Sequence, residues 1–359
     1  MSEMIRSRAP VRIDFAGGWT DVPPFSAEVG GTVVNATITR YAYATLVPTP
    51  DNAFRLESGD YETYVETRDI RHIEYDGNLD LLKAAVRRMD LYVGGHIITR
   101  SDAPPGSGTG SSASMGVALV GLLAEATTVG TPETLVGRES CAPDRSVGRT
   151  GQTMARAEIA ALANKLEIEE LEIQGGKQDQ YAAALGGISF MGFKDPEVTT
   201  ERLQVSRDFL YELEKHLLLV YTGKSRLSGD IISRVMGAYK QNDPQVKTAL
   251  MNIRQASLDM KDAFVAEDLG RVGEVLDFNW ENQKQLYPEM TTPKIEALLT
   301  VARPEGVLGA KACGAGGGGC ILLLCERDRE HLVRRAVTDL GGIPIDFNFD
   351  HDGLQVWRP

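Results

Sequence analysis

The stretch that decides the fold is Asp102-Ala103-Pro104-Pro105-Gly106-Ser107-Gly108-Thr109-Gly110-Ser111-Ser112-Ala113-Ser114. Three glycines at alternate positions follow two prolines and precede a run of mostly small apolar residues, 115–126. Glycine permits positive φ angles and a close approach of the backbone to a ligand. Ser111 or Ser112 suits the N-cap of the buried helix that the apolar run predicts. Backbone N–H groups that converge at a helix N-terminus form a site for an anion such as phosphate.

This loop differs from the common nucleotide-binding motifs. It lacks the Gly-Lys-Ser/Thr ending of a P-loop and the spacing of a dinucleotide-binding strand. A flexible Gly/Ser linker is the alternative interpretation, because linkers of this composition behave as coils. However, residues 93–99 predict a strand before the loop, and the helix follows it, so both ends are held. We therefore predict a phosphate-binding loop.

Composition limits the classes of protein to consider. A chain of 359 residues suits two domains, and 42% hydrophobic with 25% charged residues is typical of a soluble globular protein. A net charge of −12 argues against a nucleic-acid or anionic-membrane partner. No apolar run approaches the roughly 20 residues of a membrane span, and the first residues lack a signal-type apolar core. The four cysteines have no paired CxxC spacing, so we expect a cytoplasmic protein.

The first half of the chain alternates strands with turns before it becomes helical. The pattern predicts strands at 11–16, 32–38, 42–47, 54–58 and 61–67, with 32–47 as a strand pair and 54–67 as a hairpin, then a helix at 79–89. A glycine turn closed by Pro23-Pro24 follows the first strand. Strands followed by helices favour an α+β layered fold.

The second half is mainly helical. Residues 129–151 predict a loop or a partly disordered excursion, and the chain becomes polar around 197–207, where we place the boundary between domains 1–203 and 204–359. The pattern predicts helices at 154–171, 177–185, 229–241, 244–266, 269–286 and 293–302, and strands at 188–193, 217–221, 309–313 and 320–325. A second glycine loop, 314–319, lies between the last two strands.

Two glycine loops in different halves indicate a ligand bound where the domains meet. Phosphoryl transfer there needs a cation for the phosphates, a positive group for developing charge and a base that orients the acceptor. Ser112 can ligate Mg²⁺ from the helix start. Glu167 and Asp179 flank a Gly175-Gly176 turn that can bring both carboxylates to one site. Mg²⁺ takes one or two protein carboxylates, so we assign Glu167 to the metal and Asp179 to the base.

Other roles for these groups remain open at this point. Lys177 and Arg12 can each supply positive charge. Glu167 can also be a solvent-facing helix residue, since Glu169, Glu170 and Glu172 stand beside it. Asp179 can also be a helix N-cap, because two glycines precede it closely.

Three motifs together resemble the GHMP kinase superfamily of galactokinase, homoserine kinase, mevalonate kinase and relatives. They are 9–21, 104–114 and 311–320, in the order of the family. The resemblance implies a two-domain α+β fold, with an N-terminal α/β domain, a C-terminal ferredoxin-like domain and the active site between them. It implies ATP phosphates at Pro105, Gly106, Ser107, Gly108, Thr109, Gly110, Ser111 and Ser112, Mg²⁺ at Ser112 and Glu167, catalytic roles for Asp179 and Arg12, and an acceptor site lined by Gly17, Gly18, Trp19, Thr20, Asp21, Lys177, Gln178, Arg226, Gly314, Gly316 and Gly317.

Two branches of the superfamily compete. The segments 175–184, 221–226 and 314–319 resemble D-glycero-D-manno-heptose 7-phosphate kinases, which phosphorylate the anomeric hydroxyl of a sugar that already bears a phosphate. The segment 14–24 resembles fucokinases, which act on a free sugar. We expect the heptose-phosphate branch, with a free-sugar 1-kinase as the alternative and a non-catalytic sugar sensor as a third reading. A homodimer is left open.

A distal phosphate would need basic partners. The candidates are Lys177, Lys224, Arg226 and either Arg6 or Arg8. Two features depart from the family pattern: Thr109 stands where leucine is usual, and the 129–151 segment is longer than usual.

Overall fold

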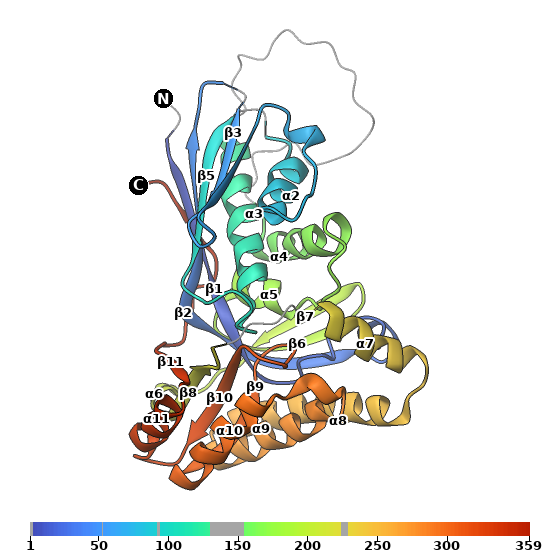
Figure 1. Ribbon diagram of the computed structural model, residues 1–359, viewed down its shortest axis with the longest axis vertical. Helices are drawn as coiled ribbons and strands as arrows, with labels where there is room; N and C mark the ends of the chain where they lie inside the picture. Colours follow the sequence, from blue (N-terminus) through green and yellow to red (C-terminus); the bar gives the residue numbers. More distant parts are fainter. Residues whose placement is uncertain (1–2, 52, 92–93, 130–153, 224–228) are drawn as a thin grey trace.

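The computed structural model describes residues 3–51, 53–91, 94–129, 154–223 and 229–359. Two β-sheets organise these residues, one toward each end of an elongated molecule (Figure 1). The first has the strand order β12-β1-β2-β5-β3-β4, with β6 also on β2 and β7 on β6, and the second has the order β11-β8-β10-β9. The predicted α+β class is confirmed.

All neighbouring strands pair antiparallel except β3 and β5, which are parallel. Strands β8 and β10 lie in the middle of the second sheet and are buried almost throughout, so they read as continuous apolar runs. The first sheet comprises β1 (Ile5–Ala16), β2 (Gly31–Pro48), β3 (Phe54–Ser58), β4 (Thr63–Thr67), β5 (Gly95–Ser101), β6 (Ile188–Lys194), β7 (Glu197–Arg202) and β12 (Gln355–Trp357), and the second β8 (Leu217–Tyr221), β9 (Val307–Ala312), β10 (Cys320–Cys325) and β11 (Ile343–Ile345).

The strand pair predicted over 32–47 is wrong, because β2 is one strand. Its register against β1 shifts between residues 38 and 41, so Thr39 and Arg40 form a β-bulge. The Thr39 N–H donates to the Asn348 carbonyl at 2.9 Å, which holds the bulge against the C-terminal segment. A bulge bends a strand without ending it, so the apolar pattern is interrupted although the chain does not reverse.

Helices pack on one face of the first sheet (Figure 1). Helix α3 lies against β1 and β2 on one side and against α2, α4 and α5 on the other, so it is apolar all round. It is the helix predicted after the glycine loop. The helices of this half are α1 (Phe25–Glu28), α2 (Asp80–Met89), α3 (Ser111–Val129), α4 (Arg156–Lys165) and α5 (Gln178–Leu185), with a 3₁₀ turn η1 (Ile70–His72) and a π-helical turn η2 (Leu166–Glu170).

The second half contains the four long helices that the sequence predicts and two, α6 and α11, that it does not. They are α6 (Arg207–His216), α7 (Gly229–Lys240), α8 (Pro244–Val265), α9 (Leu269–Lys284), α10 (Pro293–Ala302) and α11 (Glu330–Asp339), with 3₁₀ turns η3 (Pro288–Met290) and η4 (Arg303–Glu305). The predicted excursion over 129–151 lies, from residue 130 on, outside the described residues. In the ranges that are described, no helix is both long and apolar enough to cross a membrane.

The two halves share one hydrophobic core where they meet. Helices α8 and α9 pack against β1, and α8 also packs against β2. The Phe264 ring from α8 meets Phe15 of β1 edge-on, with ring centroids 5.0 Å apart, and Phe209 of α6 at 5.8 Å. The ends of β1 and β9 that carry the predicted motifs are therefore fixed relative to each other by packing.

Candidate active site

The two glycine loops, predicted from different halves of the chain, touch each other. Gly108 has φ +76°, and a Cβ built on it would lie 2.6 Å from the Cys313 carbonyl oxygen. A Cβ on Gly314 would lie 2.7 Å from the Gly108 oxygen. The Cys320 N–H donates to the Ser107 carbonyl at 2.7 Å. Side chains at these glycines would force the loops apart, so the residue type itself permits the contact.

Arg12 and Asp179 form an ion pair against the first glycine loop. Arg12 is 4% exposed, and its Nη2 and Nε lie 2.6 and 2.8 Å from Asp179 Oδ1. Its Nη1 donates to the Gly108 carbonyl at 2.6 Å. The other oxygen, Oδ2, faces the loop, since a Cβ on Gly110 would lie 2.9 Å from it. The described residues offer Oδ2 no hydrogen bond, and the Asp179 side chain keeps 26% of its surface exposed.

The position of α5 decides between the two readings of Asp179. The helix begins at Gln178, and the N-cap position falls at Lys177. Asp179 therefore lies in the first turn and does not cap the helix. Its carboxylate is therefore not used as a helix cap and can take part in the active site.

Glu167 lies on the π-helical turn η2, whose altered geometry is frequent at functional sites. Ser112 Oγ donates to Glu167 Oε1 at 2.7 Å, and Gln180 Nε2 donates to Oε2 at 2.6 Å. Burial raises the pKa of Glu167 to about 7, and the charge of Asp179 adds to the rise while the two hydrogen bonds oppose it. A desolvated carboxylate beside a hydroxyl is a donor set that fits Mg²⁺. Glu167 is half-buried with both oxygens bonded inside the protein, which argues against a solvent-facing role, whereas the neighbouring Glu169 is exposed.

Asp21 links the first motif to the start of α5. It is 2% exposed. Its Oδ2 accepts the Gln178 N–H at 3.0 Å, and its Oδ1 accepts Gln178 Nε2 at 3.3 Å. A Cβ on Gly176 would lie 1.8 Å from Oδ2, so only glycine fits there. Burial raises the pKa of Asp21 to about 6, and the charges of Asp179 and Asp14 contribute.

The raised pKa of Asp21 gives a stability prediction. Because the folded protein binds the proton more tightly than the unfolded chain, whose pKa is near 3.8, the free energy of unfolding falls as pH rises from about 4 to about 6. Asp21→Asn removes this penalty. We expect it to raise the free energy of unfolding at pH 8 by about 1–3 kcal/mol and to leave it nearly unchanged at pH 4.

Urea denaturation at both pH values measures the effect. Asp339→Asn, at an exposed position on α11, is the control and should show no such dependence. A variant at Asp21 that is no more stable than the parent at pH 8 contradicts the assignment of a carboxyl group whose charged form is destabilised by burial.

Several predicted acceptor-side residues make contacts within the protein. Thr20 Oγ1 donates to the Gly17 carbonyl at 2.7 Å and accepts the Thr32 N–H at 3.0 Å. Trp19 has φ +88° and is 4% exposed, within the apolar cluster that also contains residues of α7. The turn 17–20 is thus built to hold Asp21 in place.

The remaining acceptor-side residues are placed as follows. A Cβ on Gly18 would lie 2.2 Å from Asp14 Oδ2. Lys177 pairs with Asp195 at the turn after β6. Arg226 lies outside the described residues.

Hydrogen bonds with the end of α9 and with η3 hold the third motif in place. The Gly317 N–H donates to the Met290 carbonyl at 2.7 Å, and Gln283 Nε2 donates to the Gly314 carbonyl at 3.0 Å. Gly316, at φ +77°, approaches the same Met290 carbonyl. The loop is therefore rigidly positioned beside the first glycine loop.

Three residues of the site were not predicted. Gln180 holds Glu167, and Lys311 pairs with Asp14. The signal for Lys311 is a single lysine in an otherwise small and apolar strand, Val-Leu-Gly-Ala-Lys-Ala. Gln180 has only its place beside Asp179 as a signal.

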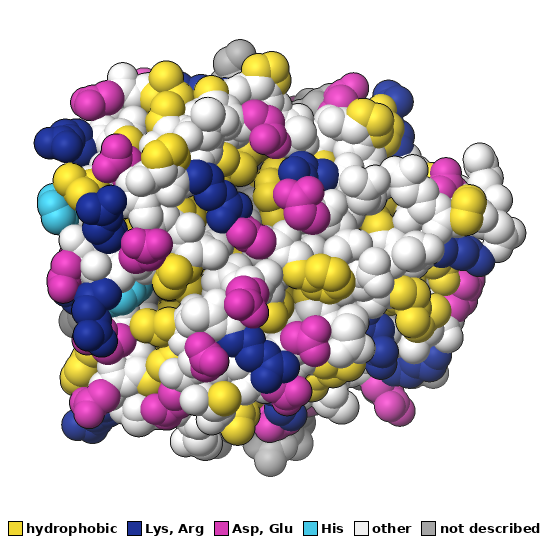
Figure 2. All heavy atoms as spheres, turned by 90° about the horizontal axis from the view of Figure 1, so that it is seen from below, with side chains coloured by type: hydrophobic (Ala, Val, Ile, Leu, Met, Phe, Trp, Pro, Cys, Tyr) yellow, Lys and Arg dark blue, Asp and Glu magenta, His cyan; other side chains and the backbone are white. Residues whose placement is uncertain are grey.

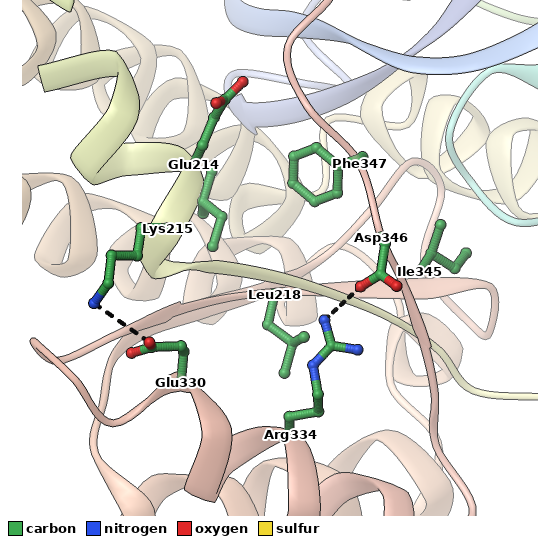
Figure 3. A pocket seen from close by; sticks show the side chains of 9 residues that line it. Glu214, Lys215, Leu218, Glu330, Arg334, Ile345, Asp346 and Phe347 are labelled. Atoms are coloured by element: carbon green, nitrogen blue, oxygen red, sulfur yellow. Dashed lines mark hydrogen bonds and ion pairs between the residues drawn. The ribbon is translucent and has the colours of Figure 1, made fainter. Parts of the chain in front are cut away.

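A cavity of about 150 Å³ lies elsewhere, between α6, α11 and β11 (Figure 3). Four of its charged groups form two pairs: Lys215 Nζ lies 3.3 Å from Glu330, and Arg334 Nη2 lies 2.6 Å from Asp346. None of the candidate site residues lines it. In Figure 2, basic and acidic side chains are interspersed over the lower face, which gives no continuous basic surface among the described residues seen there.

Comparison with known proteins identifies the family. Residues 80–141 match the model described as GHMP kinases N terminal domain, and residues 260–342 match GHMP kinases C terminal. The chain contains the N-terminal and C-terminal domains of the GHMP kinases. This GHMP kinase is a phosphotransferase with an alcohol group as acceptor and ATP as the phosphoryl donor.

Individual relatives refine the comparison. This GHMP kinase is 29% identical over 360 residues to D-glycero-alpha-D-manno-heptose 7-phosphate kinase of Campylobacter jejuni, covering 99% of each chain. It is 25% identical to L-fucokinase/L-fucose-1-P guanylyltransferase of Bacteroides fragilis, covering 99% of this chain but 39% of that protein.

Solved structures agree with the fold. A structure described as D-glycero-D-manno-heptose 1-phosphate kinase from Bacteroides thetaiotaomicron superposes with a TM-score of 0.78 at 28% identity, covering 99% of each chain. A galactokinase from Lactococcus lactis complexed with galactose has a TM-score of 0.72 at 19% identity, covers 100% of this chain and 96% of its own, and shares the fold.

Proposed function

We propose that this GHMP kinase transfers phosphate from ATP to the anomeric hydroxyl of a sugar phosphate, D-glycero-D-manno-heptose 7-phosphate, giving the 1,7-bisphosphate. The observation that carries the chemistry is the Asp179 carboxylate, with one oxygen fixed by Arg12 and the other facing the glycine loop. The choice of sugar is supported by the match to the Campylobacter kinase over 99% of both chains. A cytoplasmic location, where ATP is available, is part of this proposal.

The chain's own residues divide the work. The backbone of 105–112 and the N-terminus of α3 would bind the ATP phosphates. Asp179 Oδ2 would accept the proton of the sugar hydroxyl. The hydroxyl oxygen would then bond to the γ-phosphorus of ATP while the bond between that phosphorus and ADP breaks. Arg12 would stabilise the charge on the transferred group while it holds Asp179 in place. Asp21 and Gln178 would orient the sugar's other hydroxyl groups.

A divalent cation fits the donor set described above. Ser112 and Glu167 would hold Mg²⁺, with water and phosphate oxygens completing its coordination. When bound, Mg²⁺ neutralises charge on the phosphate oxygens. Burial raises the pKa of Glu167 to about 7. A positive ion beside this carboxylate would stabilise its charged form.

The positions of Arg6 and Arg8 on β1 bear on the proposed partners of the distal phosphate. Arg8 stacks over Tyr41 with its guanidinium 4.4 Å from the ring centroid, and Arg6 lies roughly 20 Å along β1 from Arg12 at about 3.3 Å per residue. Both therefore lie on a part of β1 away from Arg12, which argues against a contact of either one with the distal phosphate. Lys177, Lys224 and Arg226 remain our proposal for this contact; Lys224, like Arg226, lies outside the described residues.

A free-sugar 1-kinase of fucokinase or galactokinase type is the second candidate. The fucokinase-like first motif favours this candidate. However, this chain spans only 29–39% of the length of the fucokinase proteins that it matches, which weakens the comparison. A non-catalytic sensor is disfavoured because the glycine loop, Glu167 and Asp179 are all present and lie together.

Release of ADP across a substrate panel tests the proposal. The panel comprises heptose 7-phosphate, free heptose, fucose and galactose, each with Mg·ATP. We expect kcat/KM for heptose 7-phosphate to exceed that for each free sugar by about 10²-fold or more, since a lost charged contact costs about 2–3 kcal/mol. Faster turnover of fucose or galactose would support the second candidate. Binding of ATP and sugar without any turnover would support the sensor.

A further inference from the structure

A fully buried ion pair joins the two sheets beside the active site. Lys311 Nζ of β9 lies 2.6 Å from Asp14 Oδ2 and 2.8 Å from the Asp14 carbonyl oxygen of β1. The two side chains are 0% and 2% exposed. Asp14 belongs to the first motif and Lys311 to the third, so the pair joins the two motifs. Neither residue has a role in the mechanism above.

Packing stability is a poor explanation for this pair. Removing two charges from water is costly, and well-packed apolar residues often replace a buried ion pair without loss of stability. The pair is also incompletely satisfied, since Asp14 Oδ1 is buried with no hydrogen-bond partner in the described structure. An arrangement of this kind at this place points to a role in the site.

The surrounding charges indicate what that role is. Asp14 and Arg12 are two residues apart on β1, so both side chains leave the same face of the strand. Arg12 experiences the negative charge of both Asp179 and Asp14. Two carboxylates therefore act on one guanidinium, and Lys311 pairs with one of them.

We propose that Lys311 is a positioning residue: by pairing with Asp14, it leaves Arg12 fixed on Asp179 and on the first glycine loop. Without the ammonium group, the uncompensated Asp14 carboxylate attracts Arg12 away from Asp179. The inference rests on the proposed role of Arg12 in phosphoryl transfer. Its distinctive consequence is that the damage done by losing Lys311 depends on the charge of Asp14.

Four variants of the full chain test this dependence: Lys311→Met, Asp14→Asn, the double variant, and Lys83→Met. Lys83 is the matched control, because it is 1% exposed and pairs with Asp76 and Asp80, neither of which is a candidate site residue. We expect Lys311→Met to lower kcat by about 10²-fold, the effect of a misplaced catalytic group, with KM for the sugar changed by less than about threefold because the interaction acts in the transition state.

The double variant supplies the decisive measurement. Adding Asp14→Asn to Lys311→Met should raise kcat at least about tenfold above that of Lys311→Met, since the competing charge is gone. The single variant Asp14→Asn should keep a kcat within about tenfold of that of the parent. Lys83→Met should lower the melting temperature without changing kcat. If Lys311→Met does not fold, the double variant is compared with Asp14→Asn, and similar kcat values support the proposal.

Two results overturn the proposal. The first is a kcat for Lys311→Met equal to that of the parent. The second is a double variant that folds but is no faster than Lys311→Met, or far slower than Asp14→Asn. The assays use the best substrate of the parent enzyme, so a wrong choice of sugar is recognised from the substrate panel and does not affect this comparison. A parent enzyme that turns over no sugar refutes both the proposed function and this inference.

Discussion

Asp179→Asn is expected to lower kcat by about 10³-fold, within the range observed for loss of a general base. The amide keeps the shape of the side chain and an oxygen that can accept from Arg12, whose Nη2 lies 2.6 Å from Oδ1 in the parent. It cannot take a proton from the sugar hydroxyl. ADP release at saturating ATP and sugar measures the change, and KM for ATP should stay within about threefold, because the loop backbone binds the phosphates.

A second variant separates the chemical step from sugar binding in this experiment. Asp195→Asn changes a carboxylate that pairs with Lys177 on the turn after β6. It should affect the KM for the sugar rather than kcat. An Asp179→Asn variant that melts like the parent and retains more than about a tenth of its kcat would show that Asp179 is not the base.

Glu167→Gln is expected to raise the Mg²⁺ concentration for half-maximal activity and to lower kcat by about 10²-fold or more, because a bound cation contributes several kcal/mol to phosphoryl transfer. Glutamine keeps an oxygen that can accept from Ser112, which donates at 2.7 Å in the parent, but it lacks the charge that attracts the cation. Mg²⁺ titrations at fixed ATP, with free Mg²⁺ in excess, measure both effects.

Glu169→Gln is the matched control for the cation site. Glu169 stands on the same π-helical turn, two residues after Glu167, and is exposed. It should leave both kcat and the Mg²⁺ dependence unchanged. Equal Mg²⁺ dependence in Glu167→Gln and Glu169→Gln would remove Glu167 from the cation site and leave Ser112 without its carboxylate partner.

Local patterns were sufficient to predict most of the fold. The glycine loop and α3 could be predicted because backbone freedom and an apolar run both act over a few residues. The Gly175-Gly176 turn likewise indicated that Glu167 and Asp179 share one site, and the structure brings both against the start of α3 and its loop. These features depend on neighbours in sequence.

The features that sequence reasoning missed depend on distant contacts. The bulge at Thr39 and Arg40 exists because the C-terminal segment bonds to it, and β12 forms because β1 offers it a partner. The Asp14–Lys311 pair joins residues almost 300 positions apart. A local sequence pattern does not predict contacts between such distant residues. A single lysine in an apolar strand does indicate, however, that a buried partner of opposite charge is present.

The return of β12 to the first sheet has a consequence for the chain as a whole. Arg6 of β1 stands opposite Trp357 of β12 in an antiparallel pair. Neighbouring strands are about 5 Å apart, so an engineered linker of a few residues from β12 to β1 would close this fold into a ring. Such a ring, reopened at an exposed turn such as the one at Asn242, would carry the same active site in a new linear order.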